Sequence, residues 1–266
     1  MHTLIIPSLV INRAIHYHQI PTPQPIINKV TVPAMSTTAS GSAEEAASVT
    51  CVDFWCNEFG MRARLALREK RVPFEYVEED LRVRERSALV RRMNPAHAAV
   101  PILIHAGRPV CGSLNIVEYV DEVWGTTTSR PHLLPADPLE RARARFWASF
   151  VDRELYGAQT RLFTSRGEEK AKAAAELLGH LRRLEAVLGD EQAFFGGDEL
   201  GFLDVAILPF STMFYGYRQH GGVDVEAECP ALARWVARCA GRQSVRDVLP
   251  SGIDMYAIHK EFYGIE

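Results

Sequence analysis

Two stretches of the chain place a polar side chain where a helix is expected to begin. Asn57 follows a mostly apolar run that ends at Trp55 and precedes a helical pattern over Gly60–Lys70. Ser113 stands at the head of a second helical pattern that runs to Trp124. The first N–H groups of a helix are unpaired and its dipole is positive there, so helix starts favour anions. Both positions are therefore candidates for holding an anionic group.

The pattern around these two positions predicts a small sheet with covering helices. Apolar runs at Cys51–Trp55 and Val72–Val77 read as strands, and two more short strands flank a turn after Pro101. The order is strand, helix, strand, helix, strand, strand, helix, which predicts a mixed sheet with ligands at the carboxyl ends of its strands. In the helix Gly60–Lys70, apolar residues share one face and arginines the other.

The second half of the chain carries only helical spacing. A Pro- and Thr-rich segment at residues 127–137 reads as a linker. After it, apolar positions recur at helical spacing with Pro or Gly at the ends of the runs. The sequence therefore predicts a domain of strands and helices at residues 49–126, the linker, and an all-α domain at residues 138–266.

Composition narrows the classes of partner. The 30 basic and 33 acidic residues give a net charge of -3, so no strong field favours nucleic acid or an anionic membrane surface. The five cysteines form no pattern typical of a metal site, and their odd number argues against a disulfide framework. We therefore expect no metal and a reducing compartment, the cytoplasm.

The first 48 residues differ from the rest of the chain. Up to Ala34 they include no acidic residue, and their apolar runs are too short to span a bilayer. We interpret residues 1–48 as a disordered extension or a mispredicted start, with Met35 as the alternative start. Organellar targeting by residues 1–34 is the competing interpretation.

From Cys51 onward the chain resembles a plant tau-class glutathione transferase. The resemblance rests on the run Trp55-Cys-Asn-Glu-Phe59, the frame Asn94–Leu103, Ser113, and the run Gly201–Phe210. It implies the glutathione transferase fold: an α+β thioredoxin-like N-terminal domain followed by an all-α helical-bundle C-terminal domain. It also implies a homodimer, glutathione as co-substrate, and conjugation of the glutathione thiolate to hydrophobic electrophiles, as in detoxification.

The resemblance assigns the thiolate-stabilising position to Asn57, which stands where tau-class enzymes have a serine. An amide can donate a hydrogen bond to a thiolate, although through a longer arm. The alternative is that Asn57 only caps the helix, a role for which Asn is well suited. A second alternative is that Cys56 itself performs thiol chemistry. The competing interpretation of Cys56 is a buried thiol at the end of a strand.

The resemblance also assigns the glutathione contacts. Val100 and Pro101 match a cis pair whose first residue pairs with the peptide through its main chain, and Ser113 matches the residue that binds the γ-glutamyl carboxylate. Gly112 stands where the family has a glutamate, and Ala99 where it has a lysine. Arg86 matches a residue that faces the glycyl carboxylate of glutathione. The alternative is that Arg86 is one more solvated charge. If the losses at Ala99 and Gly112 empty the site, the alternative function is a non-catalytic carrier of hydrophobic ligands.

The same resemblance places the electrophile between the two domains. It assigns the hydrophobic wall to Phe59, Phe150, Glu154 and Met213, although aromatic residues at helical spacing are often core. Asp204 is predicted to be structural, returning a hydrogen bond to the helix start at Gly201, with a cost of about 1 kcal/mol on replacement by alanine.

Overall fold

The computed structural model describes residues 48–125 and 132–265. The predictions made for residues 1–47, including the alternative start at Met35, lie outside the described residues, as does the part of the linker at 126–131. Both predicted domains lie within one compact unit of the chain. None of the described helices is long and apolar enough to cross a membrane.

The N-terminal domain is built on a four-stranded mixed sheet in the order β2-β1-β3-β4. Strands β1 (Val49–Asp53) and β2 (Glu75–Glu78) are parallel, whereas β3 (Ile102–His105) and β4 (Arg108–Cys111) are antiparallel to their neighbours. The predicted strand at Val72 begins three residues later, because Lys70 and Arg71 form the turn that ends the preceding helix and Pro73 offers no N–H to a ladder.

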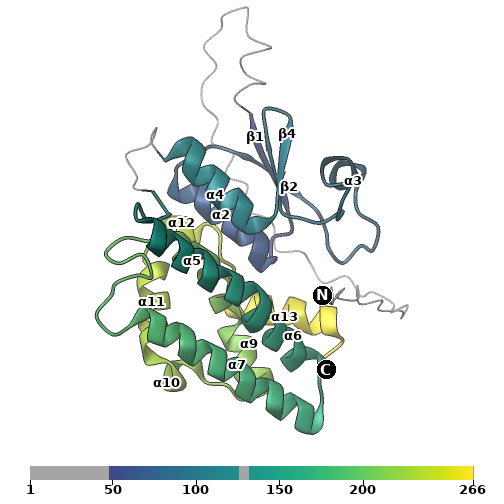
Figure 1. Cartoon of the computed structure of the whole chain (residues 1–266). Helices are drawn as coiled ribbons and strands as arrows, with labels where there is room; N and C mark the ends of the chain where they lie inside the picture. The colour runs from purple at the N-terminus through teal and green to yellow at the C-terminus, as the bar shows by residue number, and fades with distance from the viewer. Residues whose placement is uncertain (1–47, 126–131, 266) are drawn as a thin grey trace, which may run out of the picture. The chain divides into compact units, whose positions relative to one another are not determined.

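Helices cover both faces of this sheet. Helices α2 (Glu58–Glu69) and α4 (Ser113–Trp124) pack together on one face, and α3 (Ala88–Met93) lies on the other (Figure 1). The alternation of β-strand side chains explains the division: Cys51 and Leu103 join the large core, whereas Val52 and Ile102 pack with Val90 of α3. The prediction of a thioredoxin-like domain is confirmed.

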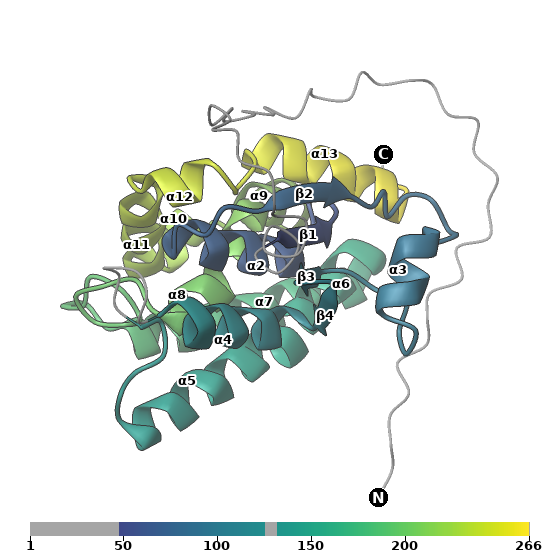
Figure 2. The same cartoon turned by 90° about the horizontal axis from the view of Figure 1, so that it is seen from above.

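The C-terminal domain contains only helices among its described residues, as predicted. They are α5 (Pro138–Phe150), a π-helical turn (Val151–Leu155), α6 (Tyr156–Thr164), α7 (Gly167–Leu188), α8 (Phe202–Ile207), a 3-10 turn (Leu208–Met213), α9 (Phe214–Gly221), α10 (Val225–Glu228), α11 (Pro230–Ala240), α12 (Gln243–Arg246) and α13 (Gly252–Tyr263). Helix α13 packs against α9 and the 3-10 turn, and α5 packs against α8. Seen from above, α13 and α5 lie at opposite edges of the view (Figure 2).

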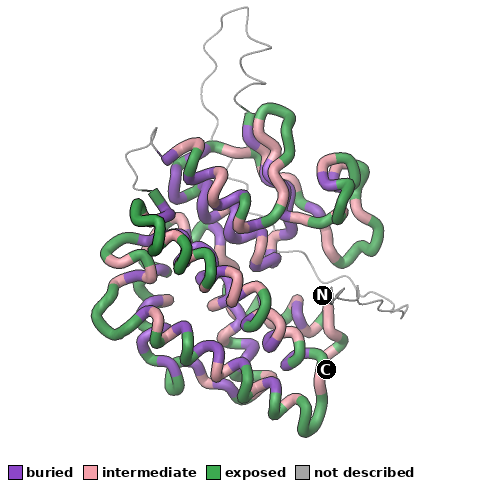
Figure 3. The backbone as a smooth tube through the Cα atoms, in the orientation of Figure 1, coloured by how far each residue is buried: buried purple, intermediate pink, exposed green. Residues whose placement is uncertain are grey.

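The segment Leu203–Tyr217, which has helical spacing of its apolar residues, is not one continuous helix. Pro209 has no backbone N–H, and the chain changes there from α-helix to a 3-10 turn before it continues as α9. The buried residues line the faces that the helices turn to one another and to α2 and α4, whereas α5 is largely exposed (Figure 3).

The helical domain covers part of the arginine-bearing face of α2. Arg62 is fully buried, and its Nε donates to the Ala206 carbonyl at 2.9 Å. Lys70, also fully buried, pairs with Asp121 of α4 at 2.7 Å. Asp121 further accepts the N–H groups of Leu133 and Leu134, where the chain enters the second domain. Buried charges thus join the two domains.

Gly60 marks the closest approach of α2 to the sheet. A Cβ added there would lie 1.8 Å from the carboxyl group of Asp53. We expect Gly60→Ala to destabilise the protein by about 2 kcal/mol or more in urea unfolding, since overpacking outweighs the helix-propensity gain. Gly179→Ala in α7 is the matched control, because a Cβ there meets nothing within 4 Å. If Gly60→Ala and Gly179→Ala changed the free energy of unfolding equally, this account of the packing at Gly60 would be contradicted.

Candidate functional site

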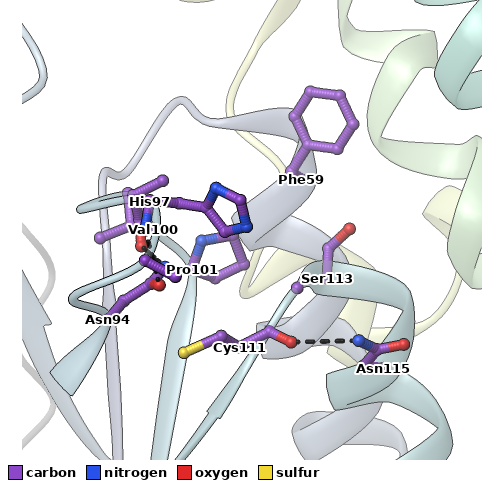
Figure 4. Close-up of a pocket in the computed structure, with 11 residues that line it drawn as sticks. Phe59, Asn94, His97, Val100, Pro101, Cys111, Ser113 and Asn115 are labelled. Carbon is purple, nitrogen blue, oxygen red and sulfur yellow. Dashed lines mark hydrogen bonds between the residues drawn. The ribbon is translucent and has the colours of Figure 1, made fainter. Parts of the chain in front are cut away.

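A pocket of about 500 Å³ opens where the starts of α2 and α4 meet the loop before β3. A volume of this size is typical of small-molecule sites. Its lining comprises Phe59, Asn94, Ala96, His97, Ala99, Val100, Pro101, Cys111, Gly112, Ser113 and Asn115 (Figure 4). The predicted residues Phe59, Ala99, Val100, Pro101, Gly112 and Ser113 are thus brought together at one place.

The loop before β3 is held in shape by Asn94. The Asn94 amide donates to the Ala99 carbonyl at 2.9 Å, and its Oδ1 accepts the N–H of His97 at 3.3 Å. The Val100–Pro101 peptide bond is cis, as expected. The result is that the main chain of Val100 borders the pocket, with the His97 imidazole beside it (Figure 4).

The opposite wall is the start of α4. Gly112 is the N-cap residue, with a φ of 91° that a glycine adopts without strain. Ser113 is the first helical residue, and its hydroxyl accepts from Nη1 of the buried Arg62 at 3.1 Å. Asn115 donates to the Cys111 carbonyl at 3.2 Å, and it lies beside the position of the side chain that Gly112 lacks. Helix N–H groups and a nearby guanidinium make this wall suited to a carboxylate.

Asn57 caps α2, and its side chain is fixed at both ends. Its Oδ1 accepts the N–H of Phe59 at 3.2 Å, and its Nδ2 donates to Oδ1 of Asp53 at 2.8 Å. The capping role is therefore confirmed. An amide nitrogen has two hydrogens, and no second acceptor for Nδ2 is found among the residues that the structure describes. The stabilisation of a thiolate by Asn57 stays a prediction.

Asp53 controls the environment of that amide. Burial raises the pKa of Asp53 to about 7, although Arg64, 3.2 Å away, and the hydrogen bond from Asn57 lower it in part. Asp53 is therefore ionised mainly above neutral pH, where it accepts most strongly from the amide.

The structure disfavours thiol chemistry at Cys56. The side chain is 3% exposed, and burial, with the charge of Glu58, raises the pKa of its thiol far above the ordinary value. A buried, protonated thiol is a poor nucleophile. Cys111 is the cysteine that lines the pocket, and burial raises its pKa as well.

Arg86 does not reach the pocket. Its guanidinium donates to the carbonyls of Asp80, Leu81 and Val83, and so braces its own loop. These hydrogen bonds do not support the predicted contact of Arg86 with a carboxylate of the ligand. They also differ from the alternative, in which Arg86 is a solvated charge. His97 and Asn115 are the polar pocket residues that the sequence reasoning missed, although both lie within five residues of a predicted contact.

The predicted hydrophobic wall is only partly assembled. Phe59 packs edge-on against Tyr156 and Phe210, with ring centroids 4.9 and 5.8 Å away. Phe150 instead contacts Trp147 and His180, and the charge of Glu154 also acts on His180, toward α7. Met213 is fully buried in the core. Tyr156 and Phe210 are therefore the aromatic neighbours of Phe59 that the sequence reasoning missed.

No group of three or more potential metal ligands occurs among the described residues, whether His, Cys, Asp or Glu. The polar atoms that face the pocket are main-chain groups, a serine hydroxyl, amides and an imidazole. They suit a zwitterionic peptide with carboxylates at its ends.

Comparison with known proteins places both domains in one family. Residues 58–123 match the model of the glutathione S-transferase N-terminal domain, and residues 139–238 match that of the C-terminal domain. The chain is similar to the "Probable glutathione S-transferase parC" of Nicotiana tabacum, with 42% identity over 221 residues, which cover 82% of this chain and 98% of the relative.

Two solved structures share the fold at a similar level. A rice glutathione S-transferase, "Rice GST1", in complex with glutathione matches with a TM-score of 0.76 and 43% identity, covering 82% of this chain and 97% of that one. A tau-class glutathione S-transferase from mango matches with a TM-score of 0.75 and 34% identity, covering 80% and 98%. The likeness spans both described domains.

Proposed function

Because the chain belongs to the tau class of the glutathione S-transferase family, we propose that its pocket holds glutathione with the sulfur beside the start of α2. The observation that carries the proposal is the pocket of about 500 Å³ bordered by Val100, Ser113 and Phe59. The chain is a glutathione transferase, and this enzymatic function is favoured over the carrier alternative by relatives that are themselves named transferases.

Glutathione lies between the loop before β3 and the start of α4. The main chain of Val100 pairs with the peptide, and Ser113 with the N-terminal N–H groups of α4 binds the γ-glutamyl carboxylate. Gly112 and Ala99 supply no charged side chain to the ligand. In their place, His97 and Asn115 line the pocket and offer an imidazole and an amide to the two ends of the peptide.

The chemistry is attack by the glutathione sulfur on a hydrophobic electrophile. The free N–H of the Asn57 amide and the N-terminal dipole of α2 stabilise the thiolate, and the thiol proton passes to solvent. With an aryl halide, the sulfur–carbon bond forms as the carbon–halogen bond breaks and halide leaves. Phe59 and Tyr156 present the aromatic surface for the electrophile, and the buried Phe210 packs behind Phe59.

We also propose a homodimer that acts in the cytoplasm in detoxification. Leu139 and Phe146 lie two turns apart on α5, and their side chains are 58% and 59% exposed. Large apolar side chains on one helix face favour contact with a second copy of the chain. Phe146→Glu tests this contact. We expect the molar mass in solution to be that of a dimer for the wild type and that of a monomer for the variant.

Ser113→Ala tests the glutathione site. We expect the dissociation constant for glutathione, measured by titration calorimetry, to rise about tenfold or more, because a hydrogen bond to a charged group contributes about 1.5–3 kcal/mol. Ser165→Ala, at the end of α6, is the control and should bind like the wild type. Unchanged binding in Ser113→Ala would place glutathione elsewhere, and no binding by the wild type would refute the proposed site.

A further inference from the structure

A buried ion pair lies one residue beyond Asn57. Glu58, the first residue of α2, is 5% exposed, and its Oε1 accepts from Nε2 of Gln159 at 2.9 Å. The same oxygen lies 3.3 Å from Nε2 of His259 on α13. The other ring nitrogen of His259 contacts the Met255 carbonyl at 2.9 Å. Helices from both domains thus meet at one carboxylate next to the proposed sulfur position.

Both partners carry charge. For Glu58, burial acts to raise the pKa, but the hydrogen bond and charge of His259 lower it overall. For His259, burial acts to lower the pKa, but Glu58 raises it overall. The two directions agree, so the pair is a carboxylate and an imidazolium.

The other groups around the pair remain neutral or are paired elsewhere. Tyr217 donates to Oε1 of Gln159, and burial raises its pKa, as it does for Tyr156 and Tyr263. Arg62 also feels the charge of Glu58, but its Nη2 is 2.7 Å from Asp152. Among the described residues, the only cation within 4 Å of the Glu58 carboxylate is His259.

The charge of Glu58 acts on the start of α2. It raises the pKa of the Cys56 thiol. Burial is the largest cause of that shift, and the charge of Glu58 is the second largest. A glutathione sulfur beside Asn57 lies at the same helix start. An uncompensated carboxylate there opposes the formation of a thiolate, because like charges repel strongly in a site shielded from water.

We propose that His259 is a positioning residue for the reaction: its imidazolium neutralises Glu58, and so lets the start of α2 keep the glutathione sulfur ionised. The C-terminal helix is then part of the thiolate site although it does not line the pocket. The inference rests on the proposed function and adds to it a residue that acts through Glu58.

His259→Gln tests the proposal, since glutamine can still donate to Glu58 but carries no charge. The measurement is the pH profile of kcat/KM for an aryl halide at saturating glutathione, which reports the ionisation of the bound thiol. We expect the apparent pKa of the bound thiol to rise by about one unit, which lowers the rate about tenfold at pH values below that pKa. At those pH values the KM for glutathione should stay within about twofold, because the pair does not touch the ligand.

The double variant Glu58→Gln/His259→Gln removes both charges. We expect it to return to within about threefold of the wild-type rate at the same pH, which a purely structural role would not produce. The difference between His259→Gln and the wild type should also be confined to pH values below the raised pKa of His259, because above it the wild-type imidazole is neutral as well. Glu58→Gln alone should leave the pKa of the bound thiol no higher than in the wild type.

His220→Gln is the matched control. His220 stacks on Phe163, the ring that His259 also contacts, but the charges that act on it come from Lys170 and Lys260. Its pH profile should equal that of the wild type. An unchanged profile in His259→Gln, or a double variant as impaired as the single one, overturns this inference alone. A wild-type chain that neither binds nor conjugates glutathione overturns the proposed function and this inference with it.

Discussion

Replacing Asp204 by alanine is expected to destabilise the protein by about 3–5 kcal/mol, enough to unfold much of the helical domain at moderate temperature. The buried carboxylate accepts three backbone N–H groups, those of Phe195, Gly196 and Gly201, each at 2.9 Å. It also accepts Nε1 of Trp235 at 2.7 Å. Removing it leaves four donors without a partner, and those of Gly201 and Trp235 are buried. Urea unfolding followed by circular dichroism measures the loss.

Two variants separate this network from ordinary capping. Asp204→Asn keeps the shape and one acceptor oxygen, so it should lose less than the alanine variant. Asp254→Ala removes an acid at the equivalent position of α13, which is exposed and bonded to Ser251. It should cost about 1 kcal/mol or less. If Asp204→Ala lowered the free energy of unfolding no more than Asp254→Ala, the hydrogen-bond network of Asp204 would contribute no more to stability than an ordinary cap.

Replacing Arg62 by methionine is expected to affect both stability and glutathione binding. Methionine fills much of the volume, but the Ala206 carbonyl and the Asp152 carboxylate lose their partner. We expect about 3 kcal/mol of destabilisation, toward the low end for a broken buried pair because Asp152 is partly exposed. The Ser113 hydroxyl, which accepts from Arg62, loses its support as well.

The two effects can be separated by experiment. Urea unfolding reports the stability, and calorimetry below the unfolding transition reports the affinity for glutathione, which should fall about tenfold. Arg68→Met is the control, because Arg68, in the last turn of α2, is exposed and contacts the Phe74 ring rather than Ser113. Wild-type affinity in a folded Arg62→Met variant would show that Arg62 does not support the carboxylate site.

Local sequence was sufficient for the parts of the site that depend on the main chain. The Asn94–Leu103 frame predicted the cis bond and the position of Val100, and the pattern after Cys111 predicted the helix start at Ser113. Both are properties of a short segment. The order of strands and helices was predictable for the same reason, with errors of a few residues where a turn or Pro209 interrupted a pattern.

Contacts between distant segments could not be predicted in this way. The burial of Arg62 could not be predicted, because helical periodicity separates apolar from charged positions but does not show that a second domain covers the charged face. Asp204 was recognised as a cap, but its hydrogen bonds to Trp235 and to the loop at Phe195 were not predicted, because both lie elsewhere in the sequence. The pairing of Glu58 with His259 had no local signal at all.

The conjugation rate of Asn57→Ala tests the central claim most directly. With glutathione and an aryl halide at neutral pH, we expect kcat to fall about tenfold to a hundredfold, since a hydrogen bond to a charged group contributes about 1.5–3 kcal/mol. Asn57→Ser, which restores the hydroxyl, should match or exceed the wild type. A folded Asn57→Ala variant that conjugates at the wild-type rate would contradict the account and leave the thiolate without the donor assigned to it.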